Sequence, residues 1–115
     1  ADRLQAEGTA AFKAGRHQNA VELYTDALQL RPDDATLLSN RSAAWLLIGH
    51  PEAALEDAMK AVEVRPGWGK AHGRHGAALS ALGCPKEAIA AYERGLKLSP
   101  DSVNMRAEVG RLKLE

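Results

Sequence analysis

Cysteine and long apolar runs are scarce in this sequence of 115 residues. Cys84 is the single cysteine, so the chain cannot form an internal disulfide, which is typical of a reducing compartment such as the cytoplasm. The longest apolar run, residues 43–48, is far shorter than the roughly 20 residues that a helix needs to cross a bilayer, and no signal-peptide pattern precedes it. We therefore expect a cytoplasmic protein without a membrane segment. Because the chain starts without an initiator Met, we also expect it to be a domain of a longer protein.

Net charge and aromatic side chains are also low. Fifteen Lys and Arg residues balance fifteen Asp and Glu residues, and aromatic residues make up 4% of the chain. A chain without net charge creates no overall field toward nucleic acid or an anionic membrane, and its basic residues form no stripe with interleaved aromatics. We therefore expect no nucleic-acid partner, and any site for an anion must be local.

The sequence lacks the motifs that catalysis and cofactor binding require. It contains no phosphate-binding glycine loop, no nucleophile elbow and no paired-histidine zinc motif. His72 and His75 are three apart, but no third ligand has suitable spacing, so we expect both to pack between helices. The prediction is a protein that is not an enzyme and has no cofactor and no metal site.

A repeat of 34 residues dominates what is present, as shown by glycines 15, 49 and 83 (49 − 15 and 83 − 49). Four sets of residues keep this spacing: Gly15, Gly49 and Gly83; Ala20, Ala54 and Ala88; Ala27, Ala61 and Gly95; Pro32, Pro66 and Pro100. In each unit the glycine separates two apolar stripes of helical period, which predicts two antiparallel helices. Such a hairpin cannot bury both of its faces alone, and about three stacked units are the usual minimum for stability.

These units predict an all-α fold, an α-solenoid of three antiparallel helix hairpins plus a capping helix. A single domain, residues 1–115, would comprise three repeats and the capping helix in residues 1–34, 35–68, 69–101 and 102–115. In the capping helix we expect Val103, Val109 and Leu112 to face inward. The acidic residues expected to accept hydrogen bonds at helix starts are Asp33, Asp34 and Asp101.

Polar residues are expected to gather on one surface of the solenoid. Lys70 and Arg74 are four apart near a helix start, so they share a face, repel each other and lie near the positive end of the helix dipole. A bound anion would relieve this repulsion, although a solvated charged face is the alternative interpretation. Asn40 has the same repeat position as Arg74 (40 + 34 = 74), and Gln5 and Thr9 are one turn apart. None of the five belongs to an apolar stripe, so we expect all of them to face the concave groove.

The period, with its glycine, alanine and proline positions, resembles that of the tetratricopeptide repeat (TPR). Two stretches, Leu-Leu-Ser-Asn-Arg-Ser-Ala-Ala-Trp ending at Trp45 and Arg-Pro-Gly-Trp-Gly-Lys ending at Lys70, resemble the carboxylate-clamp domains of the heat-shock organising co-chaperone and its relatives. The resemblance implies a groove for the C-terminal Glu-Glu-Val-Asp tail of Hsp70- and Hsp90-class chaperones. It also implies five peptide-binding residues, which by position are Gln5, Thr9, Asn40, Lys70 and Arg74.

The chain departs from this family pattern at two positions, because Gln5 replaces a lysine and Thr9 replaces an asparagine. Losing one charged hydrogen bond weakens binding by roughly tenfold or more. We therefore predict a co-chaperone-like adaptor, a monomeric domain within a larger chain, whose partly altered clamp binds an acidic C-terminal peptide. The alternative is a structural or assembly scaffold in which the clamp is unused.

Overall fold

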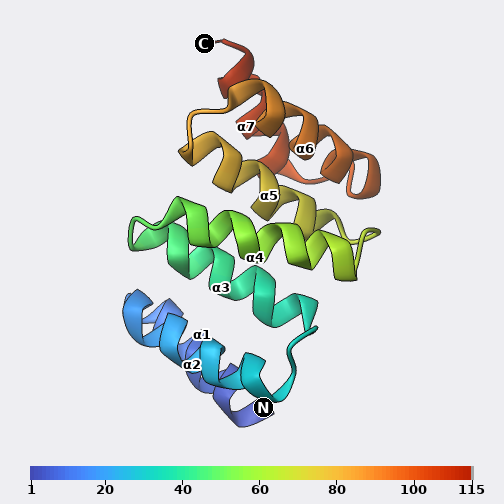
Figure 1. The fold of residues 1–115 in the computed structure, drawn as a ribbon. Helices are drawn as coiled ribbons and strands as arrows, with labels where there is room; N and C mark the ends of the chain where they lie inside the picture. Colours follow the sequence, from blue (N-terminus) through green and yellow to red (C-terminus); the bar gives the residue numbers. More distant parts are fainter. Residues whose placement is uncertain (115) are drawn as a thin grey trace.

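The computed structural model describes residues 1–114, which contain seven helices and no strand. The helices are α1 (Asp2–Lys13), α2 (His17–Leu30), α3 (Ala35–Leu47), α4 (Pro51–Val64), α5 (Gly69–Ala81), α6 (Pro85–Leu98) and α7 (Val103–Lys113). They stack as hairpins along an elongated body, from α1 and α2 at one end to α7 at the other (Figure 1). The predicted all-α solenoid of three hairpins and a terminal helix is confirmed.

The three repeat glycines produce the turns within the hairpins. Gly15, Gly49 and Gly83 have φ angles of 82°, 84° and 78°, a left-handed conformation that residues with a side chain rarely adopt. Each glycine is the second residue after the end of the first helix of its hairpin, and the second helix begins two residues after the glycine. The predicted glycine stops therefore set the antiparallel arrangement of α1 with α2, of α3 with α4 and of α5 with α6.

Close helix packing depends on glycine facing tyrosine in the first and third hairpins. A Cβ atom on Gly8 would lie 2.7 Å from the ring of Tyr24, and one on Gly76 would lie 2.9 Å from the ring of Tyr92. In the second hairpin Ser42 takes the glycine's repeat position, and its hydroxyl donates a hydrogen bond of 2.8 Å to the carbonyl of Ala54. Two different solutions thus let the first helix of a hairpin approach the second.

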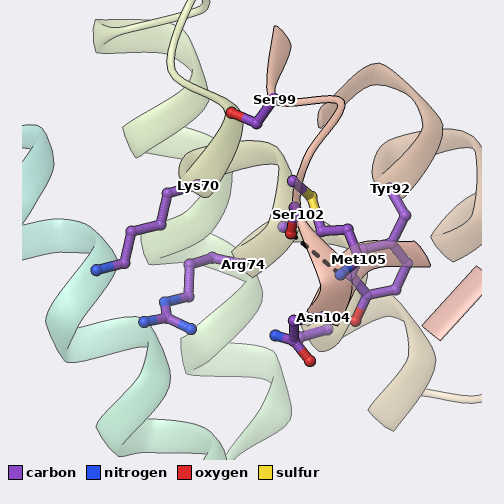
Figure 2. A pocket seen from close by; sticks show the side chains of 9 residues that line it. Lys70, Arg74, Tyr92, Ser99, Ser102, Asn104 and Met105 are labelled. Carbon is purple, nitrogen blue, oxygen red and sulfur yellow. Dashed lines mark hydrogen bonds between the residues drawn. The ribbon is translucent and has the colours of Figure 1, made fainter. Parts of the chain in front are cut away.

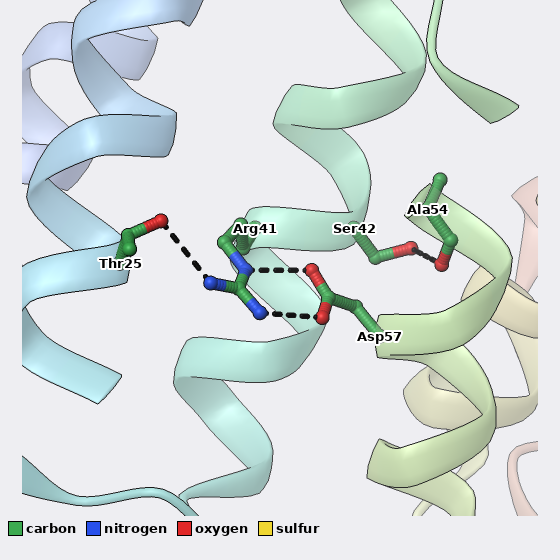
Figure 3. A network of polar contacts seen from close by, with 5 residues as sticks. All are labelled: Thr25, Arg41, Ser42, Ala54 and Asp57. Atoms are coloured by element: carbon green, nitrogen blue, oxygen red, sulfur yellow. Dashed lines mark hydrogen bonds and ion pairs between the residues drawn. The ribbon is translucent and has the colours of Figure 1, made fainter. Parts of the chain in front are cut away.

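A half-buried ion pair fixes α3 between its neighbours (Figure 3). The guanidinium of Arg41 donates to both carboxylate oxygens of Asp57 on α4, at 2.7 and 2.8 Å, and to the hydroxyl of Thr25 on α2, at 3.1 Å. The fork of arginine matches a carboxylate in this two-point geometry, which fixes direction as well as distance. Because Asn40 directly precedes Arg41, the same contacts hold the helix that presents Asn40.

The terminal helix is rotated relative to the prediction. Met105, Val109 and Leu112 are buried, whereas Val103 is 79% exposed, so the prediction that Val103 faces inward was wrong. Residues spaced by four and three lie on one helical face, and Val103, two residues before Met105, lies about 200° around the helix axis. Met105 therefore takes the inward position that was assigned to Val103.

Helix starts also differ from the prediction at two of three positions. Asp34 accepts the predicted hydrogen bond, from the N–H of Leu37 at 3.0 Å. Asp101 does not cap α7, because the hydroxyl of Ser102 accepts from the N–H of Met105 at 3.2 Å. Asp33 instead pairs with Lys60 on α4, 3.6 Å away. The residue directly before the first helical residue caps a helix. Because α7 begins at Val103, that residue is Ser102, and a cap by Asp101 would need the helix to begin one residue earlier.

Candidate functional site

The loop before α5 contacts the first turn of that helix. Trp68 is the residue before the first helical residue, and the guanidinium of Arg65 stacks over its ring at 4.5 Å. The ammonium of Lys70 lies 6.0 Å from the same ring. His72 is buried, and its Nε2 donates to the carbonyl of Pro66 at 2.8 Å, which ties the loop to the helix. The predicted packing of His72 between helices is thus confirmed.

A cavity of about 210 Å³, here called the clamp cavity, contains four of the five predicted site residues. Its lining comes from α1, α2, α3 and α5 and comprises Thr9, Phe12, Lys13, Tyr24, Asn40, Ala43, Lys70 and Arg74. The side chains of Lys70 and Arg74 extend from α5 toward α3 (Figure 2). The 34-residue register therefore brings Asn40 and Arg74 to one surface, as the sequence predicted.

Gln5 lies outside the clamp cavity. It lines a more open neighbouring cavity along α1, together with Asp2, Ala6, Thr9, Ala10 and Lys13. Thr9 lines both cavities, but its hydroxyl shares a hydrogen bond of 3.0 Å with the hydroxyl of Tyr24. The two positions at which the chain departs from the family pattern are thus also the two least available for a ligand in the clamp cavity.

The clamp cavity has a strongly positive environment. Burial, and then the nearby charge of Arg74, lower the pKa of Lys70 below its usual 10.5. Burial also lowers the pKa of Arg74, and its Nε is buried without a hydrogen-bond partner. Within residues 1–114 neither side chain forms a salt bridge, and no carboxylate lines the cavity. Two partly desolvated cations without counter-ions make a site that favours an anion.

Lys13 belongs to the site, although no sequence pattern indicated it. It is an exposed residue of α1 that lines the clamp cavity with Lys70 and Arg74, and within residues 1–114 it forms no ion pair. Gln5, Thr9 and Lys13 are spaced by four and therefore lie on one face of α1, and this spacing could have indicated Lys13 as a site residue. The third cation of the site is therefore two turns beyond the position where the family pattern has one.

A second cavity, here called the α5–α7 cavity, lies on the other side of Lys70 and Arg74 and has a volume of about 350 Å³. Figure 2 shows Tyr92 and Asn104 across this cavity from the two cations. The full lining is Lys70, Gly73, Arg74, Ala77, Tyr92, Ser99, Ser102, Asn104 and Met105. The sequence did not reveal this cavity, because α7 was interpreted only as a cap.

The described part of the chain contains no group of three or more His, Cys, Asp or Glu side chains placed to hold a metal ion. Each helix in residues 1–114 is too short or too polar to pass through a bilayer.

Comparison with protein families matches residues 3–108 to a family described as tetratricopeptide repeat. A curated relative, the Hsp70-Hsp90 organizing protein of Triticum aestivum, is 46% identical over 107 residues, which cover 93% of this chain and 18% of that protein. The chain spans less than a third of the length of the first curated relatives that it matches.

Two solved structures resemble the fold closely. The Sgt2 TPR domain from Aspergillus fumigatus superimposes with a TM-score of 0.94 at 37% identity, covering 97% of this chain and 76% of that one. The first TPR of Spaghetti (RPAP3), solved with the HSP90 peptide SRMEEVD, superimposes with a TM-score of 0.92 at 31% identity. That match covers 96% of this chain and 88% of the other.

Proposed function

The chain belongs to the tetratricopeptide-repeat family, and on this basis we propose that it is a noncatalytic adaptor domain that binds an extended acidic C-terminal peptide in its concave groove. The tail of an Hsp70- or Hsp90-class chaperone is the leading ligand, because a structural relative was solved with an HSP90 peptide ending in Glu-Glu-Val-Asp. In this proposal residues 1–34, 35–68 and 69–101 are the three repeats, and the parent protein works in the cytoplasm.

The observation that carries the proposal is the clamp cavity, in which the exposed Lys70 and the partly buried Arg74 have no counter-ion among residues 1–114. A C-terminal aspartate offers two carboxylates close together, one from the main chain and one from the side chain. Lysine supplies a point charge, arginine a planar donor fork, and the amide of Asn40 a donor and an acceptor for the peptide backbone. Capture of a C-terminal carboxylate is a recurrent mode of peptide recognition.

Lys13 supplies the cation that Gln5 cannot. It lines both the clamp cavity and the open cavity along α1, so its ammonium can approach a carboxylate in either. A charged hydrogen bond contributes about 1.5–3 kcal/mol, which is enough to offset the loss of the family lysine. The clamp then consists of Lys13, Asn40, Lys70 and Arg74, with Gln5 and Thr9 contributing neutral contacts.

A structural or assembly scaffold is the second candidate function. The replacement of two family residues by Gln5 and Thr9, and the engagement of the Thr9 hydroxyl by Tyr24, favour it. The two candidates differ in one property, since a scaffold has no use for a free peptide carboxylate.

Calorimetric titration of the folded domain with the peptide Ser-Arg-Met-Glu-Glu-Val-Asp, free or amidated at its C-terminus, tests the proposal. We expect micromolar binding of the free peptide. Amidation should weaken it at least tenfold, because it removes one of the two carboxylates of the terminal Asp that the clamp binds. Arg74→Ala should abolish measurable binding, while Arg94→Ala, which removes an exposed arginine from α6 outside both cavities, should leave it unchanged. Equal binding of both peptides, or none by either, would favour the scaffold.

The same titration tests Lys13. Lys13→Gln should weaken binding of the free peptide about tenfold, and Gln5→Lys should strengthen it, because each changes the charge available to a carboxylate. If Lys13→Gln binds as tightly as the unmodified domain, Lys13 has no part in the clamp.

A further inference from the structure

The α5–α7 cavity is rich in hydrogen-bond donors and has no acidic residue in its lining. Ser99, Ser102 and Asn104 contribute hydroxyl and amide groups from the loop before α7 and from its first turn. Lys70 and Arg74 line the opposite wall, and their charged ends extend toward α3 (Figure 2). The hydroxyl of Tyr92 is protonated at neutral pH and can donate, and burial followed by the charge of Glu108 raises its pKa further, to about 12. This combination of groups suits an anion.

The first turn of α7 adds to this positive environment. Ser102 accepts from the N–H of Met105, but helix geometry leaves the N–H groups of Val103 and Asn104 without acceptors inside the helix. The aligned peptide dipoles of the 11-residue helix place partial positive charge at the same end. Asn104 also has the repeat position of Lys70 (70 + 34 = 104), so α7 continues the row of polar residues that lines the groove.

One acidic group close to Tyr92, that of Glu108, is already paired. Glu108, one turn beyond Asn104, accepts from Arg111 at 2.7 Å, and neither residue lines the α5–α7 cavity. Glu108 therefore does not neutralise Lys70 and Arg74 from this side. The hydroxyl of Ser80 also accepts from Arg111, at 3.2 Å, which holds this pair beyond the cavity.

The distance between the two cavities sets how far apart their ligands lie along a peptide. The clamp cavity is lined from α5 toward α1, α2 and α3, whereas the α5–α7 cavity is lined from α5 toward α6 and α7, and both include Lys70 and Arg74. A helix with its side chains is about 10–12 Å across, and an extended chain advances about 3.3–3.6 Å per residue. A peptide whose last residue fills the clamp cavity therefore reaches the α5–α7 cavity about three residues upstream.

We propose that the α5–α7 cavity is a second carboxylate subsite, in which Asn104, Tyr92 and Arg74 bind an acidic side chain three residues before the C-terminal residue of the same peptide. This inference rests on the proposed function and extends it by giving α7 a direct role in recognition. In a peptide that ends in Glu-Glu-Val-Asp, the third residue before the terminal Asp is a glutamate.

A charge introduced at the subsite tests this assignment. Asn104→Asp places a carboxylate on the cavity wall, and an acidic residue in the first turn of a helix favours the helix, so the variant should fold. Asn19→Asp makes the same change at an exposed position of α2 and serves as the control. Both variants and the unmodified domain are titrated with the free peptide Ser-Arg-Met-Glu-Glu-Val-Asp and with two analogues that carry Gln in place of the second or the third residue before Asp.

Asn104→Asp should weaken binding of the parent peptide about tenfold, and of the analogue with Gln at the third position less than twofold, because that analogue has no charge to repel. The analogue with Gln at the second position should respond like the parent peptide, and Asn19→Asp should bind as the unmodified domain does. An equal effect of Asn104→Asp on all three peptides, or no effect, would overturn the subsite. Amidation of the parent peptide separates the two proposals, because its effect on the unmodified domain depends on the clamp cavity alone.

Discussion

At the scale of single residues, Lys70 is placed for binding rather than for stability. It lies four residues before Arg74 on one helix face, near the positive end of α5, and the two side chains lack counter-ions within residues 1–114. Like charges at this spacing destabilise a helix by a few tenths of a kcal/mol. Such a cost is typical of a binding site, where removal of the functional group stabilises the fold.

We therefore expect Lys70→Met to raise the free energy of unfolding by a few tenths of a kcal/mol at neutral pH. Because folding lowers the pKa of Lys70 below 10.5, the native state binds fewer protons than the unfolded state in the alkaline range. The destabilisation that the charged Lys70 causes is complete below its native pKa and disappears as the pH approaches 10.5. The difference in free energy of unfolding between Lys70→Met and the unmodified domain should therefore shrink between the native pKa and pH 10.5. Urea denaturation of both proteins from pH 7 to 10.5 measures this difference. A variant that is less stable at neutral pH would show that Lys70 has a stabilising partner.

At the scale of helices, the close contact of α5 with α6 depends on one glycine. Glycine inside a helix normally costs about 1 kcal/mol relative to alanine. Gly76 reverses this rule, because a Cβ atom there would lie 2.9 Å from the buried ring of Tyr92. Gly110 of α7 is exposed, and a Cβ atom added there would have no neighbour within 4 Å, so Gly110 provides a matched comparison.

Gly76→Ala should therefore lower the free energy of unfolding by about 1–3 kcal/mol, since the ring of Tyr92 has to move in a packed core. Gly110→Ala should raise it by up to about 1 kcal/mol through helix propensity alone. Thermal unfolding followed by circular dichroism distinguishes the two effects. If both alanine variants were stabilised, the ring of Tyr92 could yield and the contact would not limit packing.

At the scale of the whole molecule, α7 closes the stack of hairpins and also lines a cavity. Its buried residues Met105, Val109 and Leu112 pack in one cluster with Leu79 and Tyr92. A terminal repeat with an uncovered apolar face is unstable in a solenoid, so this cluster determines whether the third hairpin stays folded. Recognition at Asn104 and stability at Leu112 thus depend on the same helix.

Leu112, 5% exposed, and Leu114, 90% exposed, allow a direct test of this role. Leu112→Ala should lower the free energy of unfolding by about 2–5 kcal/mol, because it leaves a cavity between α6 and α7. Leu114→Ala should change it by less than about 0.5 kcal/mol. Urea denaturation of the two variants beside the unmodified domain provides the comparison, and similar values for both would mean that α7 is not docked through Leu112.

Much of the candidate site could be predicted from the sequence, because its members are related by the repeat. Asn40 and Arg74 share a repeat position, so the stacking of repeats puts them side by side. Lys70 lies one helical turn from Arg74 and therefore joins them on the same face. Gln5 was assigned by resemblance, and the structure places it in the neighbouring cavity. The sequence pattern did not indicate Lys13, because its place beside Lys70 in the clamp cavity depends on how α1 packs against α2 and α3, which no local pattern encodes.

The sequence by itself determined the helices, their pairing and the number of hairpins, because the 34-residue period and its glycines act through contacts between chain neighbours. Only the tertiary structure decided that Met105 rather than Val103 faces inward, that Ser102 caps α7 and that the first turn of α7 shares a cavity with Arg74. The physical reason is that the rotation of a helix about its own axis is set by the surface on which it docks. For α7 that surface is formed by α5 and α6, and only their packed arrangement specifies it.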